Sequence, residues 1–137
     1  MQVRDGMSEE VLTVGPDHTL REAASAMCRR RVGAAIVIDP EAPGPGVITE
    51  RDILLSVARG QDPDRERVGR HLTSDLTFAS PEWSLEQAAA AMVRGSFRHL
   101  VVVDGGELAG ILSMRDIVRC WTGDGASCEV PASAASA

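Results

Sequence analysis

Two short elements of the sequence combine a hydroxyl with a carboxylate three residues later: Thr49 with Asp52, and Ser113 with Asp116. At the start of a helix, such a hydroxyl accepts a hydrogen bond from an unpaired backbone amide, and the helix dipole favours the carboxylate. A carboxylate is also a pure acceptor that can bind two hydroxyl groups of a ligand at once. Both elements therefore predict a helix start, and both are candidate ligand-binding sites.

The remaining reactive side chains form no catalytic pattern. The sequence has no Ser-His-Asp or Cys-His arrangement and no glycine-rich phosphate loop, so we expect no enzyme. A zinc site is an alternative, although no ligand spacing points to one; its candidate ligands are Cys28, His71, His99, Cys120 and Cys128. The run Arg29 to Arg31 could bind an acidic partner, or it could end a helix, where cations are favoured by the dipole.

The chain is acidic, with a formal net charge of −6 over 137 residues. This balance argues against a general binder of nucleic acid or of anionic membranes, because such proteins need a basic face. No apolar run approaches the roughly 20 residues of a membrane span, and the three cysteines form no close pair. We therefore expect a cytoplasmic protein with reduced thiols and with no nucleic-acid or membrane partner. Residues 123–137, rich in Ala, Ser and Gly, are expected to be disordered.

An internal repeat organises the sequence. Residues 16–27 recur as 81–92, an offset of 65 that holds from Val3/Val68 to Asp39/Asp104, and residues 46–52 recur as 110–116. Neither half alone is large enough to bury a stable core, so the two halves should share one. We divide the chain into a first repeat (1–60), a linker (61–67), a second repeat (68–122) and the tail.

Each repeat predicts the order β-α-β-β-α. The first helix of each begins at a capping box, Thr19 with Glu22 or Ser84 with Gln87, and Gly95 should end the second of these helices. Both helices carry an apolar stripe at i, i+3, i+4 and i+7: Leu20, Ala23, Ala24 and Met27, and Leu85, Ala88, Ala89 and Met92. Strands are predicted at 11–14, 34–38 and 46–49, and at 76–79, 100–103 and 110–113. Closing helices are predicted at 51–59 and 115–121.

With these motifs in this order, the chain resembles a tandem pair of cystathionine-β-synthase (CBS) domains, also called a Bateman module. The resemblance rests on the two Pro-x-x-Thr/Ser-Leu-x-x-Ala-x-x-x-Met segments, the strands that end in Asp39 and Asp104, and the two Gly-h-h-Thr/Ser-x-x-Asp elements. It covers residues 3–121. It implies an α+β fold of two β-α-β-β-α repeats packed through their sheets with pseudo-two-fold symmetry. It also implies regulation by adenosine-containing ligands in clefts between the repeats.

The resemblance assigns roles to individual residues. Asp52 and Asp116 would accept hydrogen bonds from ribose hydroxyls, with Thr49 and Ser113 beside them. Arg98 and His99 would bind phosphate in the cleft that holds Asp52, unless they are simply a solvated strand end. The matching stretch of the first repeat, 32–35, has no charged or donor side chain, so the Asp116 cleft would lack a phosphate partner.

These observations predict a regulatory module that senses AMP, ADP or ATP without any other cofactor and signals to an unidentified protein. Two alternatives remain: a structural or interaction dimer with vestigial clefts, and a sensor of S-adenosylmethionine or another adenosyl compound. The closing helices also predict a homodimer, because they carry more apolar surface than one repeat can bury. The residues behind that prediction are Ile53, Leu54, Val57, Ile117, Val118 and Trp121.

Overall fold

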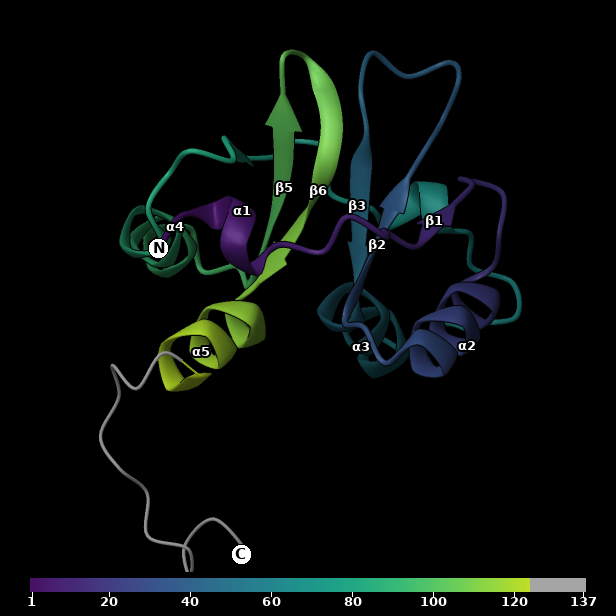
Figure 1. The fold of residues 1–137 in the computed structure, drawn as a ribbon. Coiled ribbons are helices and arrows are strands. Elements are labelled where there is room, and N and C mark those ends of the chain that lie inside the picture. The colour runs from purple at the N-terminus through teal and green to yellow at the C-terminus, as the bar shows by residue number, and fades with distance from the viewer. Residues whose placement is uncertain (124–137) are drawn as a thin grey trace, which may run out of the picture. The chain divides into compact units, whose positions relative to one another are not determined.

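The computed structural model describes residues 1–123 (Figure 1). The chain forms two compact units: one is Glu10–Thr77, and the other combines Met1–Glu9 with the chain from Phe78 onward. Each unit contains one three-stranded sheet and its helices, which confirms the α+β class.

The unit Glu10–Thr77 has the predicted order β-α-β-β-α, followed by one turn of 3₁₀ helix. Its elements are β1 (Thr13–Val14), α2 (Leu20–Arg30), β2 (Ala34–Val37), β3 (Gly46–Thr49), α3 (Glu50–Ala58) and η1 (Val68–Arg70). The sheet has the order β1-β2-β3, in which β1 is parallel to β2 and β2 is antiparallel to β3. All four residues of β2 are buried, as their continuous apolar run predicts.

The second unit repeats this order. Its elements are α1 (Val3–Gly6), β4 (Phe78–Ala79), α4 (Leu85–Gly95), β5 (His99–Asp104), β6 (Glu107–Ser113) and α5 (Met114–Gly123). Strands β5 and β6 form a hairpin whose turn residues, Gly105 and Gly106, both have positive φ angles (60° and 84°). Glycine adopts these angles without steric cost, so the two glycines favour this tight hairpin connection.

Both predicted capping boxes are present. The Thr19 hydroxyl accepts a hydrogen bond from the Glu22 amide, and the Ser84 hydroxyl accepts one from the Gln87 amide. The stripes of α2 and α4 face their sheets, since Leu20 and Leu85 are fully buried.

Gly95 ends α4 as predicted, but it does not do so through a left-handed glycine conformation. Gly95 is the last helical residue, and Ser96 takes the left-handed conformation that follows the helix (φ 57°). A Cβ atom on Gly95 would lie 1.8 Å from the ring of Phe97. Glycine is therefore needed here because an aromatic ring packs directly against the helix, and not because of its backbone freedom.

Two short helical turns, α1 and η1, were not predicted. Both begin at fully buried valines, Val3 and Val68, which occupy equivalent repeat positions. The amide of Val3 donates to the carbonyl of Trp83 (2.8 Å), and the amide of Val68 donates to the carbonyl of His18 (2.8 Å). Trp83 and His18 are also equivalent positions. The leading segment of each repeat therefore packs against the body of the other repeat, and the packing boundaries fall at 9/10 and 77/78.

Candidate functional site

Thr49 and Asp52 form a reciprocal hydrogen-bonded pair where β3 passes into α3. One Asp52 oxygen, Oδ2, accepts hydrogen bonds from the amide and the hydroxyl of Thr49, both at 2.9 Å. The Thr49 hydroxyl accepts in turn from the Asp52 amide at 3.2 Å. Among the described residues, the other carboxylate oxygen of Asp52, Oδ1, has no hydrogen-bond or ion-pair partner. The capping prediction is confirmed, and one acceptor atom remains open.

Ser113 and Asp116 repeat this arrangement where β6 passes into α5. Asp116 Oδ2 accepts from the Ser113 amide at 2.8 Å, and the Ser113 hydroxyl accepts from the Asp116 amide at 3.0 Å. Here, however, the second oxygen is occupied, because Arg119 Nη1 donates to Asp116 Oδ1 at 3.2 Å. This contact was not predicted, although the i, i+3 spacing of an acid and a base on a helix is visible in the sequence.

The equivalent position in α3 is Leu55, which cannot donate a hydrogen bond. With a 64-residue offset in this part of the repeat, Leu55 corresponds to Arg119 and Asp52 corresponds to Asp116. The two Thr/Ser-x-x-Asp elements thus share backbone geometry and differ in whether the outer carboxylate oxygen is available.

Arg98 and His99 lie at the end of the sheet where α5 begins. His99 opens β5 and is the register partner of Ser113, and the Met114 amide donates to the Arg98 carbonyl at 2.8 Å. Arg98 is exposed. In the unit Glu10–Thr77, Ala34 pairs with Thr49, and the Gly33 carbonyl accepts from the Glu50 amide at 2.9 Å. The structure therefore brings Arg98 and His99 next to Ser113 and Asp116 of their own unit, whereas a joint role of Arg98 and Asp52 stays a prediction.

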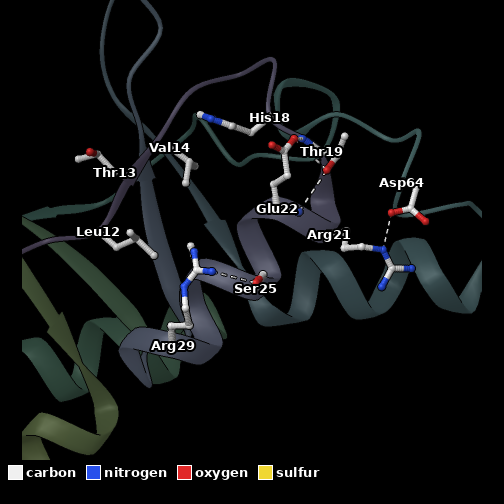
Figure 2. Close-up of a pocket in the computed structure, with 11 residues that line it drawn as sticks. Leu12, Thr13, Val14, His18, Thr19, Arg21, Glu22, Ser25, Arg29 and Asp64 are labelled. Carbon is white, nitrogen blue, oxygen red and sulfur yellow. Dashed lines mark hydrogen bonds and ion pairs between the residues drawn. The ribbon is translucent and has the colours of Figure 1, made fainter.

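A shallow groove of about 510 Å³ lies between β1 and the exposed face of α2 (Figure 2). Its polar groups are already satisfied by one another. The Glu22 carboxylate accepts hydrogen bonds from the amide and the hydroxyl of Thr19, and these bonds lower the pKa of Glu22 below its ordinary value. His18 Nδ1 accepts from the Gly15 amide at 2.9 Å, and Arg21 pairs with Asp64. The groove contains neither Thr/Ser-x-x-Asp element, and both of its carboxylates, Glu22 and Asp64, already have a partner.

The proposed zinc ligands do not assemble in the described part of the chain. Residues 1–123 contain no group of three or more His, Cys, Asp and Glu side chains that could hold a metal ion. His71 Nε2 is instead 2.7 Å from Glu66 Oε1. Cys128 lies outside the described residues, as does the predicted tail apart from Gly123, which is the last residue of α5. No described helix has the length and apolar character needed to cross a membrane.

Comparisons with known proteins agree on one family. The CBS domain model matches the chain twice, at residues 2–59 and 68–123. The CBS domain-containing protein YhcV of Bacillus subtilis (strain 168) is 36% identical over 116 residues, which cover 84% of this chain and 81% of that protein. The solved CBS-domain containing protein ATU1752 from Agrobacterium tumefaciens aligns with a TM-score of 0.81 and 32% identity, over 88% of this chain and 98% of its own.

A further solved structure carries a ligand. The CBS domain protein PAE2072 from Pyrobaculum aerophilum was solved in complex with AMP, and it aligns with a TM-score of 0.74 and 32% identity. The alignment covers 85% of this chain and 89% of that protein.

Proposed function

Because the chain belongs to the CBS domain family and contains a tandem pair of these domains, we propose that it is a regulatory module that binds an adenine nucleotide. AMP, ADP and ATP are the candidate ligands, and the bound state is read by a protein partner that the sequence does not identify. The AMP complex of the Pyrobaculum relative supports this ligand class.

The open oxygen of Asp52 carries the proposal. Asp52 is held by its capping bonds, which use Oδ2 and leave Oδ1 outside the cap. A ribose presents two neighbouring hydroxyls, and a fixed carboxylate can accept from them without losing a bond of its own. Asp116 is the weaker candidate, because a ribose would first have to displace Arg119.

Arg98 is the proposed phosphate partner. Its exposed guanidinium has no hydrogen bond or ion pair among the described residues, and its planar fork can donate two parallel hydrogen bonds to a phosphate. His99 and the hydroxyls of Thr49 and Ser113 complete the proposed set. The matching start of β2, with Val32 and Gly33 in place of Phe97 and Arg98, brings no cation. A site built on that stretch would suit an adenosyl ligand without phosphate, which keeps S-adenosylmethionine as the second candidate.

A ligand panel followed by three variants tests the proposal. Thermal shifts with adenosine, AMP, ADP, ATP, S-adenosylmethionine and NAD should show stabilisation by the nucleotides, about 2.7 kcal/mol at 100 times the dissociation constant. In calorimetric titrations, Asp52→Ala should weaken adenosine and AMP alike by about 1.5–3 kcal/mol, the value of a hydrogen bond to a charged group. Arg98→Ala should weaken AMP far more than adenosine, and Asp116→Ala should have the smallest effect on AMP.

Other outcomes select the alternatives. If no compound raises the unfolding temperature, the chain is better explained as an interaction module with vestigial sites. Stabilisation by S-adenosylmethionine alone would select the adenosyl sensor. Equal losses of adenosine and AMP in Arg98→Ala would remove Arg98 from phosphate binding.

A further inference from the structure

A second pocket, of about 630 Å³, lies within the unit Glu10–Thr77 between the end of α3 and η1. Four of its seven lining residues are arginines, and one more is a histidine. The lining residues are Arg59, Gln61, Arg65, Glu66, Arg67, Arg70 and His71. In a chain with 20 acidic and 14 basic residues, this concentration of positive charge is unexpected.

Few carboxylates neutralise the positive charge of this pocket. Its single carboxylate, Glu66, is already bonded to His71 Nε2 at 2.7 Å. Of the two nearby aspartates, Asp64 pairs with Arg21 on the α2 side, and Asp62 Oδ2 lies 3.8 Å from Arg65 Nε. Arg67 donates to the backbone carbonyl of Asp17, which fixes its position without cancelling its charge.

The side chains of Arg59 and Arg70 are available to bind a ligand. Within residues 1–123, neither guanidinium has a hydrogen bond or ion pair. Arg59 has a structural explanation, because it caps the C-terminal end of α3, where a cation is favoured by the dipole. Arg70 has no such explanation, since it ends a 3₁₀ turn of three residues. Like charges gathered around one hollow repel one another unless an anion lies between them.

We propose that this pocket binds a compact polyphosphate anion. The guanidinium fork matches pairs of phosphate oxygens, and several forks around one hollow favour a multiply charged ligand over a single carboxylate. The lining has no Phe, Trp, Tyr or aliphatic side chain, and its one ring, His71, is already bonded to Glu66, so a nucleobase would find little apolar surface to pack on. This separates the pocket from the adenosine site proposed above. Arg59, at the end of α3, lies seven residues after Asp52 and therefore roughly 10 Å along the helix axis, at a rise of about 1.5 Å per residue.

Calorimetric titration of the full chain with tripolyphosphate in low salt tests the proposal. Arg70→Ala and Arg59→Ala should each weaken binding at least about tenfold, since one charged hydrogen bond contributes about 1.5–3 kcal/mol, and Arg70→Lys should recover part of the loss. Arg94→Ala is the matched control, because it removes an exposed arginine at the end of α4 in the other unit. Arg94→Ala should change the affinity for tripolyphosphate less than about twofold, because salt screens the interaction between a distant charge and the ligand.

Urea unfolding of each variant verifies that its fold is intact. The proposal would be overturned by no binding of tripolyphosphate to the unmodified chain, by an equal loss in Arg94→Ala, or by a loss in Arg98→Ala with none in Arg70→Ala. The last result would assign the binding to the nucleotide site. Tighter binding of a hexaglutamate peptide than of tripolyphosphate would also overturn it, because the pocket would then be an acidic-peptide site.

Discussion

A single side chain distinguishes the two Thr/Ser-x-x-Asp elements. Both aspartates use one oxygen to cap a helix, but Arg119 covers the second oxygen of Asp116 while Leu55 leaves that of Asp52 open. An exposed ion pair of this kind contributes little to folding. It can still compete with a ligand hydroxyl for the same oxygen, so its main effect should be on binding.

Exchanging these two residues should exchange the properties of the two sites. Arg119→Leu should open Asp116 and strengthen adenosine binding there, seen in calorimetry as a larger number of occupied sites. Leu55→Arg should cover Asp52 and weaken binding there. Leu55 is 43% exposed, and the pair that Arg119 forms is also exposed, so stability should change by no more than about 0.5 kcal/mol in either variant. Unchanged binding in both variants would show that the arginine does not control access to the carboxylate.

At the scale of elements, local sequence patterns predicted correctly those helices and strands whose apolar residues are buried in the core. Capping boxes, apolar stripes and continuous apolar strands predicted α2, α4, β2 and β5 to within one or two residues. The turns α1 and η1 were missed because each holds one apolar residue, too few for a periodic pattern. Gly95 was expected to end α4 and does so, but its contact with the ring of Phe97 was not predicted, because that contact depends on how the ring is oriented.

The buried stripe of α4 makes a direct stability prediction. Leu85 is fully buried in the core with Leu100 and Leu112, so Leu85→Ala should lower the free energy of unfolding by about 2–5 kcal/mol. Val93 lies on the same helix and is 72% exposed, so Val93→Ala is the control and should cost less than about 0.5 kcal/mol. Urea titrations measure both. Similar losses in the two variants would mean that α4 does not bury this stripe.

The closing helices bear on the predicted homodimer. Ile117 was wrongly counted among their excess apolar surface, because it is buried in the core of its own unit. Leu54, Val57 and Val118 are half exposed or more, so the prediction now rests on them. We expect the double variant Leu54→Ser with Val57→Ser to lower the mass measured by light scattering from twice 14.5 kDa to 14.5 kDa. A single 14.5 kDa species for the unmodified chain would contradict the homodimer.

At the scale of the whole molecule, the repeat predicted the fold, and the CBS family assignment is confirmed. The residues of the candidate site were also visible in the sequence, because a capping box has a local signature. The difference between Asp52 and Asp116 was not predicted, because an i, i+3 spacing allows an ion pair without showing whether the two side chains meet. The packing of each repeat's leading segment against the other repeat could not be predicted either. Val3 and Val68 occupy equivalent repeat positions, and this equivalence would be the same if each segment packed against its own repeat.

This packing leads to a prediction for removal of residues 1–9. The deleted segment contains Val3, which is buried among residues of the second repeat, and Ser8, whose amide and carbonyl both bond to Ile111. Its loss should therefore reduce hydrogen-exchange protection in 78–123 and leave 10–77 protected. Both tryptophans, Trp83 and Trp121, pack in the affected core, so their fluorescence should change as well. The point variant Val3→Asp should reproduce the effect, because it places an unpaired charge in that core. Loss of protection in 10–77 instead would show that each leading segment belongs with its own repeat.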